Sequence, residues 1–268
     1  MYSSKKFLRV GLIGCGAIGS EILQFFDKRF FDKIRIVAIL DRDLEKTRHI
    51  IEKLHNQRPL PVTNIQELIR EKPKLVIEAA SPDAVKQYVV QLLAKNIDVL
   101  VLSVSALLDR NMLENIIRIC KRVGARLLIP SGAIGGIDIL RAHALAGLRE
   151  VVLETRKNPR ALGMYVSEPE VVYEGDIINA ISKFPRNLNV YMTVLLSIEW
   201  QYEKVKCRVV ADPGISKNVH YIYVRSDIGE AEIKIVNEPS PINPRTSRVA
   251  AFSVIAKILN YYIQEIHL

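Results

Sequence analysis

Three glycines, Gly14, Gly16 and Gly19, stand in the spacing G-x-G-x-x-G at the end of an apolar N-terminal segment. Residues 7–13 have the apolar run of a buried strand, and residues 17–30 have the apolar spacing of a helix. In such a strand–turn–helix the first glycine permits a tight turn, the second a close approach of phosphate, and the third close helix packing. The segment therefore predicts a dinucleotide-binding Rossmann unit, with the pyrophosphate at the helix N-terminus formed by Ala17 and Ile18.

An acidic residue follows the next apolar run at a position that bears on the choice of dinucleotide. Residues 34–40 predict a second strand, and Asp41 at its end is placed to bind the adenosine ribose hydroxyls. A carboxylate there favours NAD, whereas the neighbouring Arg42 could hold the 2′-phosphate of NADP. The expected cofactor is NAD or NADP, and the choice between them stays open.

Strand-like and helix-like segments alternate along the first half of the chain. The pattern predicts strands over residues 75–79, 97–103 and 126–129, and helices over residues 44–55, 65–71, 82–95 and 110–123. The segment ending at Pro61 is interpreted as a break. Alternation of this kind implies right-handed crossovers and a doubly wound parallel sheet covered on both faces. We therefore predict a Rossmann domain over residues 1–147.

The pattern changes after about residue 148. Period-two strands with one exposed face are predicted over residues 151–155, 204–211, 221–225 and 231–236, with helices over residues 176–184 and 189–199. Consecutive strands predict a smaller α+β domain over residues 148–245, built on a largely antiparallel sheet that binds substrate and forms a homodimer. The apolar helix within residues 246–268 is expected to pack back onto the first domain.

Composition excludes several classes of protein. A hydrophobic content of 49% with 25% charged residues is typical of a soluble globular protein, and no apolar stretch approaches the length of a membrane helix. The N-terminus enters the first strand without a secretory signal, and three widely spaced cysteines predict neither a disulfide framework nor a metal site. The net charge of +9 comes from dispersed lysines and arginines. We expect a cytoplasmic protein with no nucleic-acid or membrane partner.

Small or polar residues follow the predicted parallel strands, at the edge of the sheet where ligands of such folds bind. Ala80 and Ser81 follow the strand over residues 75–79, and Ser103 ends the next one. We expect these three residues to line the cofactor crevice near the nicotinamide ribose. An ordinary strand-to-helix turn is the alternative explanation for each.

One polar stretch of the second domain carries candidates for chemistry. His220 begins a predicted strand, two residues after Asn218, and imidazole is a suitable general acid or base near neutral pH. Arg156, Lys157 and Arg245 could pair with substrate carboxylates, although from composition alone solvated surface charge is the better explanation for each of them. These residues indicate an NAD(P)-linked oxidoreductase acting on a carbonyl or an imine, and their spacing does not choose between the two.

The motifs together resemble those of the archaeal and bacterial L-aspartate dehydrogenase family. The resemblance covers essentially the whole chain and rests on the combination of GLIGCGAIG, SGAIGGID, KFPRNLNV and NVHYIYV. It implies oxidation of L-aspartate with NAD or NADP to iminosuccinate, which hydrolyses to oxaloacetate and ammonia and could feed NAD biosynthesis. It also implies that His220 is the active-site histidine and that Ala133 and Asn189 contact the cofactor. Asn218, in the same polar stretch as His220, is a further candidate for binding the substrate.

Tyr191 departs from the family pattern, because relatives often have alanine at this position. Its bulk could narrow the substrate pocket or pack on the cofactor side. Other NAD(P)-dependent oxidoreductases on this scaffold, of the dihydrodipicolinate reductase or homoserine dehydrogenase kind, are the main alternative. A non-catalytic NAD(H)-sensing module is a further alternative.

Overall fold

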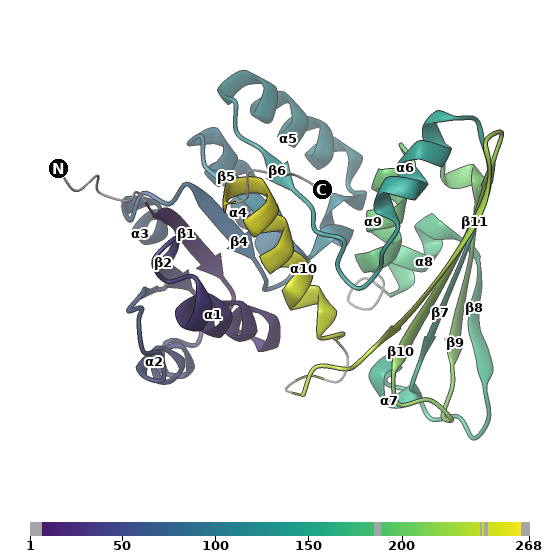
Figure 1. Ribbon diagram of the computed structural model, residues 1–268, viewed down its shortest axis with the longest axis horizontal. Helices are drawn as coiled ribbons and strands as arrows, with labels where there is room; N and C mark the ends of the chain where they lie inside the picture. The colour runs from purple at the N-terminus through teal and green to yellow at the C-terminus, as the bar shows by residue number, and fades with distance from the viewer. Residues whose placement is uncertain (1–6, 185–188, 242, 244–245, 264–268) are drawn as a thin grey trace. The chain divides into compact units, whose positions relative to one another are not determined.

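The computed structural model describes residues 7–184, 189–241, 243 and 246–263. The chain forms two compact units, the first comprising Met1–Pro130 with Ala251–Leu268 and the second Ser131–Ala250 (Figure 1). The second unit begins earlier than the boundary after residue 147 that the sequence predicts. The reason is helix α6 (Ile137–Leu145), which packs on elements of the second unit.

The first unit contains a six-stranded parallel sheet with the order β3-β2-β1-β4-β5-β6. Its strands are β1 (Leu8–Ile13), β2 (Ile34–Leu40), β3 (Leu60–Val62), β4 (Leu75–Glu78), β5 (Asp98–Val101) and β6 (Leu127–Leu128). The strand order reverses between β1 and β4, and ligands of such sheets bind beyond the carboxyl ends of the strands at this point. The doubly wound fold predicted from the sequence is confirmed.

Helices cover both faces of this sheet. They are α1 (Ala17–Arg29), α2 (Leu44–Glu52), α3 (Ile65–Arg70), α4 (Pro82–Ala94), the short η1 (Val104–Leu108) and α5 (Arg110–Val123). Four of them begin where a side chain accepts a backbone N–H at the helix start, which fixes their first turns. These capping residues are Asp43, Asn64, Ser81 and Asp109.

The C-terminal helix α10 (Val249–Ile258), followed by η3 (Leu259–Ile263), lies beside α1 in the first unit (Figure 1). Val254 and Ile258 are fully buried in the same core as Val10 and Ile22. The rings of Phe25 and Phe252 meet edge to face with centroids 5.7 Å apart. Burial of this apolar face holds the helix on the parallel sheet.

The second unit contains a five-stranded sheet with the order β11-β10-β7-β9-β8. Its strands are β7 (Leu148–Lys157), β8 (Glu170–Asp176), β9 (Val205–Ala211), β10 (Asn218–Ser226) and β11 (Gly229–Asn237). Only the β7–β9 pair is parallel among these neighbours, so the prediction of a largely antiparallel sheet is confirmed. The remaining elements are α7 (Pro159–Leu162), α8 (Ile177–Lys183), α9 (Asn189–Ser197) and η2 (Tyr202–Lys204).

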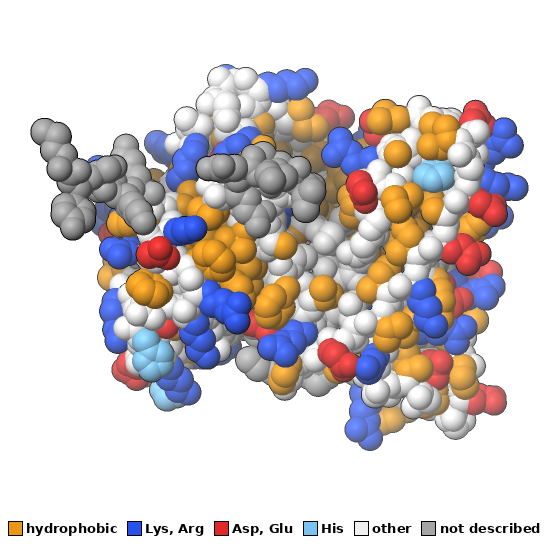
Figure 2. Space-filling view, in the orientation of Figure 1, with side chains coloured by type: hydrophobic (Ala, Val, Ile, Leu, Met, Phe, Trp, Pro, Cys, Tyr) orange, Lys and Arg blue, Asp and Glu red, His pale blue; other side chains and the backbone are white. Residues whose placement is uncertain are grey.

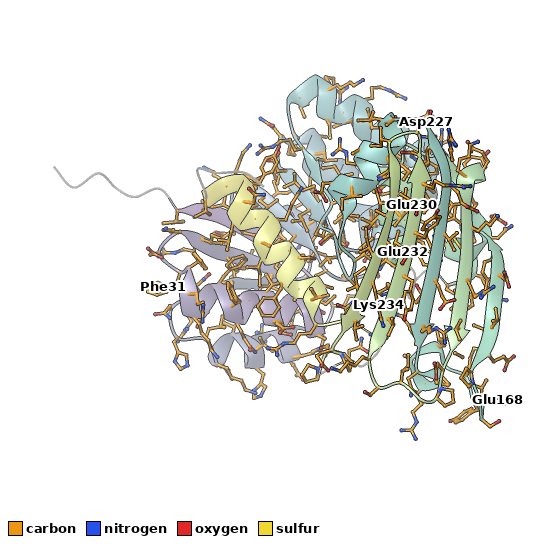
Figure 3. All side chains as sticks on the ribbon, turned by 45° about the vertical axis from the view of Figure 1, so that its right-hand side comes forward. Phe31, Glu168, Asp227, Glu230, Glu232 and Lys234 are labelled. Carbon is orange, nitrogen blue, oxygen red and sulfur yellow. The ribbon has the colours of Figure 1, made fainter. Side chains whose placement is uncertain are left out.

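Helices α6, α8 and α9 lie on one face of this sheet, whereas its other face is open in Figure 3, where Glu230, Glu232 and Lys234 follow one another along β11. The period of two along each strand determines which side chains lie on which face. No helix among the described residues has the length and apolarity needed to cross a membrane. Lysines and arginines are scattered over the face of the molecule seen in Figure 2 rather than gathered in one patch.

Candidate active site

The glycine turn between β1 and α1 has the shape that a dinucleotide requires. Gly14 has a φ of 91°, and a Cβ built there would lie 2.8 Å from the Ala79 carbonyl oxygen. A Cβ at Gly19 would overlap the Gly14 carbonyl oxygen, so the third glycine allows the helix to pack on the turn. A Cβ at Gly16 would meet nothing within 4 Å. The backbone at Gly16 is therefore the open side of the turn, where a phosphate can approach closely.

Helix α1 presents its positive end at this turn. Gly16 is its N-cap, no described side chain caps it, and its first turn contains no acidic residue. Lys28 and Arg29 lie in the last turn, at the negative end of the helix dipole. The backbone N–H groups of Ala17 and Ile18 are thus in the first turn of a helix whose N-terminus suits an anion. The turn and helix fit the pyrophosphate of NAD or NADP.

Asp41 lies directly beside the glycine turn, at the end of β2. Its carboxylate accepts the backbone N–H of Cys15 at 2.6 Å and that of Asp43 at 3.0 Å. These bonds hold the carboxylate at the turn, where the adenosine ribose of a dinucleotide is bound in Rossmann folds. Arg42 is the next residue and is exposed. Burial and the neighbouring Asp41 charge raise the pKa of the Cys15 thiol to about 11, so this thiol is neutral at physiological pH.

The ends of β4 and β5 bring together Ala80, Ser81 and Ser103, as their position at one edge of the sheet predicts. Ala80 packs on the glycine turn, since a Cβ on Gly14 would lie 2.8 Å from the Ala80 methyl group. All three residues hydrogen-bond to the Glu78 carboxylate. Sequence reasoning did not single out Glu78, although an acidic residue at the end of an otherwise apolar strand is itself unusual.

His220 lies in β10 and its register partner in β7 is Thr155. The histidine is only 3% exposed, and its Nδ1 is 2.9 Å from the Thr155 hydroxyl oxygen. Burial, assisted by the positive charge of Lys157, lowers the pKa of His220 to about 3. The imidazole is therefore neutral at physiological pH.

Lys157 shares the helix-covered face of β7 with Thr155, two residues earlier. It is 4% exposed, and burial lowers its pKa to about 8. Arg156 lies between them in sequence and so points to the opposite face. There its guanidinium bonds to the Glu154 carboxylate at 2.6 Å and lies 3.5 Å from that of Asp212. The structure thus brings Lys157, but not Arg156, to the side of the sheet that carries His220.

Asn218 and Asn237 are register partners on β10 and β11, and both are buried. Asn218 donates to the Ser247 hydroxyl at 3.1 Å, which anchors the segment before α10. Asn237 donates to the Ala133 carbonyl oxygen at 2.8 Å, which fixes the SGAIGG loop near this end of the sheet. Asn237, like Thr155, was not found from the sequence, because neither strand register nor this loop contact is visible there.

Tyr191 lies in the interior of the second unit, where it is 2% exposed. Its hydroxyl donates to the Arg208 carbonyl oxygen on β9 at 2.9 Å. Tyr191, Thr155 and His220 line a cavity of about 10 Å³, which is about the smallest that holds a single water molecule. The extra bulk of Tyr191 therefore fills the core beside His220. Asn189 begins α9 and is half-buried, whereas Arg245 lies outside the described residues.

A Rossmann unit with a dinucleotide turn, followed by a sheet unit with a buried histidine and lysine, defines a two-domain pyridine-nucleotide dehydrogenase. Residues 138–261 match the family described as "Aspartate dehydrogenase, C-terminal", and residues 14–130 match "Homoserine dehydrogenase, NAD binding domain". The chain belongs to the L-aspartate dehydrogenase family.

Relatives from two archaea and one solved structure support this assignment. The L-aspartate dehydrogenases of Methanocaldococcus jannaschii and Archaeoglobus fulgidus are 36% and 40% identical to this chain, over 94% of this chain and 96% of each relative. The crystal structure of aspartate dehydrogenase from Thermotoga maritima has a TM-score of 0.78 and 29% identity, covering 98% of this chain and 100% of that chain. The family predicted from the motifs is confirmed, and the reductase and homoserine dehydrogenase alternatives are not favoured.

Proposed function

We propose that this protein oxidises L-aspartate with NAD or NADP to iminosuccinate, which hydrolyses to oxaloacetate and ammonia. One observation carries the proposal: a dinucleotide turn and a buried histidine–lysine pair occur in a chain whose full-length relatives are L-aspartate dehydrogenases. When bound, the nicotinamide supplies the acceptor for the hydride that leaves Cα of the substrate. The chain's own residues must bind the substrate, orient it and take up a proton from its amino group.

His220 is the residue that we assign to the substrate amino group. Its Nδ1 faces the Thr155 hydroxyl at 2.9 Å, so Nε2 is the nitrogen that acts on the substrate. Because the imidazole is neutral at physiological pH, it enters the reaction as a hydrogen-bond acceptor and proton acceptor.

Lys157 is the cation that we assign to a substrate carboxylate. It lies on the same face of the sheet as His220, whereas Arg156 faces the other way and is paired with Glu154. Burial makes an ammonium group costly, so a carboxylate ligand beside Lys157 gains a strong charge-assisted contact. Asn218 lies two residues before His220 on the same face of β10 and positions this end of the sheet through Ser247.

On the cofactor side, we assign the pyrophosphate to the turn over Gly14, Gly16 and Gly19, and the adenosine ribose to Asp41. Ala133 and Asn189 are assigned to the cofactor through the family resemblance. The anchoring of the Ala133 carbonyl by Asn237 supports a fixed position for that loop.

We further propose a homodimer formed through the open face of the second sheet. This face has a shallow hollow of about 910 Å³ whose lining includes Val152, Tyr221 and Val236 among charged side chains of both signs. Tyr221 on β10 and Val236 on the neighbouring edge strand β11 are 38% and 50% exposed, so this face presents large side chains with apolar surface to solvent. Alternating Glu232 and Lys234 make the surface self-complementary in charge.

A cytoplasmic location is part of the same proposal, and the free thiols of Cys15, Cys120 and Cys207 suit a reducing compartment. Supply of iminosuccinate to NAD biosynthesis follows from the family resemblance.

The deciding experiment measures reduction of NAD and of NADP by purified protein with L-aspartate, D-aspartate, L-glutamate and L-homoserine in turn. We expect reduction with L-aspartate, and the reverse reaction with oxaloacetate, ammonia and reduced cofactor. Reduction with L-homoserine alone would move the assignment to the homoserine dehydrogenase alternative. Cofactor binding without any of these reactions would indicate the sensing module.

A further inference from the structure

Glu78 is a fully buried carboxylate at the last position of β4. Its Oε1 accepts the backbone N–H groups of Ala80 at 2.8 Å and Ser81 at 2.9 Å, and the Ser103 hydroxyl at 2.9 Å. Its Oε2 accepts the backbone N–H of Ser103 at 3.0 Å. Burial raises the pKa of Glu78, and the N–H donors from Ser103 and Ala80 oppose this effect.

These four bonds join two turns that are far apart in sequence. Ala80 and Ser81 lead from β4 into α4, and Ser103 leads from β5 into η1. β4 and β5 are adjacent parallel strands, so both turns lie at the carboxyl edge of the sheet. Without the carboxylate, the backbone N–H groups of Ala80, Ser81 and Ser103 would lose their acceptor. The link that these four bonds make between the two turns would also be lost.

The joined turns lie on a defined half of the dinucleotide site. In a sheet of this order, one mononucleotide half binds on the side of β1, β2 and β3, where Asp41 lies, and the other on the side of β4 and β5. Ala80 also packs on the glycine turn at Gly14. The two turns joined by Glu78, after β4 and after β5, therefore border the half of the site that receives the nicotinamide riboside.

We propose that Glu78 is a positioning residue for the nicotinamide half of the cofactor. Its carboxylate holds residues 79–81 and Ser103 as one rigid border of the cofactor crevice, and Glu78 itself need not touch the cofactor. This inference rests on the proposed function, because it requires that the first unit binds NAD or NADP.

The same sheet offers a matched control at the amino ends of its strands, opposite the carboxyl ends where Glu78 lies. Asp98, the first residue of β5, is also fully buried and accepts hydrogen bonds from Arg126 at 2.6 Å and from the Tyr262 hydroxyl at 2.6 Å. Its removal breaks a buried carboxylate network in the same unit without reaching the carboxyl edge. A purely structural role for Glu78 predicts that the two positions behave alike.

The experiment compares wild type, Glu78→Gln and Asp98→Asn for melting temperature and for binding of two probes, the reduced cofactor and ADP-ribose, which lacks the nicotinamide. We expect both variants to melt at lower temperature. Glu78→Gln should weaken binding of the reduced cofactor about tenfold but binding of ADP-ribose less than about threefold. The reason is that the substitution loosens only the border of the nicotinamide half, and ADP-ribose has no nicotinamide. Asp98→Asn should change neither dissociation constant.

Equal weakening of both probes by Glu78→Gln, or weakening of neither, would overturn the inference while leaving the proposed function intact. Failure of the wild-type protein to bind either reduced cofactor would overturn both. Glu78→Asp keeps the carboxylate on a side chain one methylene shorter and serves if Glu78→Gln does not fold. Wild-type affinity for reduced cofactor in Glu78→Asp, with a lowered melting temperature, would also count against the inference.

Discussion

The Thr155 hydroxyl oxygen lies 2.9 Å from Nδ1 of His220, and the two residues are register partners on neighbouring antiparallel strands. Both side chains are buried, so the bond is made away from competing water. A hydroxyl at Nδ1 constrains the ring's rotation and its tautomer. The strand pairing thus sets which nitrogen of His220 is available for chemistry.

Replacement of Thr155 by valine removes this hydroxyl with little change in volume. We expect kcat for L-aspartate oxidation to fall about tenfold, because the imidazole loses the partner that fixes its orientation. Thr155→Ser, which keeps the hydroxyl, should recover most of the activity. Steady-state kinetics of the two variants check this. An unchanged kcat in Thr155→Val would show that the hydrogen bond between Thr155 and His220 is not needed for catalysis.

A second buried histidine gives a control for His220. His143 is 7% exposed and its Nδ1 lies 2.8 Å from the Ser226 hydroxyl, on the same side of the same sheet unit. We expect His220→Asn to lower kcat by about a hundredfold or more, in the range of general acid–base catalysis. His143→Asn should lower the melting temperature while kcat changes less than about threefold. Comparable kcat losses in both variants would indicate that burial of a histidine, and not its chemistry, matters here.

The glycine turn and the alternating sheet were predictable because each depends on residues close in sequence. The G-x-G-x-x-G spacing requires a particular turn, and period-two patterns place side chains on opposite faces. The same period predicts that Arg156 and Lys157 cannot share a face, so that only one of them can lie on the face that carries His220; the strand register then shows that it is Lys157. Short β3 was missed because Pro61 lies in its middle, and β8 because its sequence alternates poorly and is largely exposed.

Contacts between distant segments were not predictable. The bond from Thr155 to His220 depends on strand register, and Glu78 gains its meaning only when the turns after β4 and β5 meet. The second compact unit begins at Ser131, before the boundary that the sequence predicts, for a similar reason. Helix α6 continues the strand–helix alternation in sequence, yet its apolar face packs on α9 and β10.

The low pKa of His220 predicts a specific dependence of stability on pH. The unfolded histidine takes up a proton below about 6.5, whereas the folded one does not until a pH of about 3. Its contribution to stability is therefore present above pH 6.5 and is lost as pH falls from 6.5 towards 3. Urea unfolding at several pH values should show a steeper loss in wild type than in His220→Asn, by up to about 1.4 kcal/mol per pH unit. Parallel curves for the two proteins would contradict the lowered pKa.

Lys157 and Arg156 are adjacent cations on opposite faces of the sheet, so substitutions at the two positions can be compared to find which face binds the substrate. Lys157→Met should raise the KM for L-aspartate about a hundredfold, because it would remove the charge-assisted contact that we propose between the buried Lys157 and a substrate carboxylate. Arg156→Met should change this KM less than about threefold, since Arg156 is paired with Glu154 and Asp212. The reverse ranking would place the substrate on the open face of the sheet.

Asp41 and Arg42 give opposite expectations for the cofactor, and the structure favours Asp41. Its carboxylate is held beside the glycine turn by the N–H groups of Cys15 and Asp43, whereas Arg42 is exposed. A carboxylate fixed at the ribose repels a 2′-phosphate, so wild type should prefer NAD to NADP in kcat/KM. Asp41→Ser should reduce that preference by about tenfold or more, mainly by raising the KM for NAD and lowering the KM for NADP. Arg42→Ala, the matched change at the neighbouring position, should leave the kcat/KM for NAD within about threefold of wild type. A wild-type preference for NADP that Arg42→Ala abolishes would assign the 2′-phosphate to Arg42 instead.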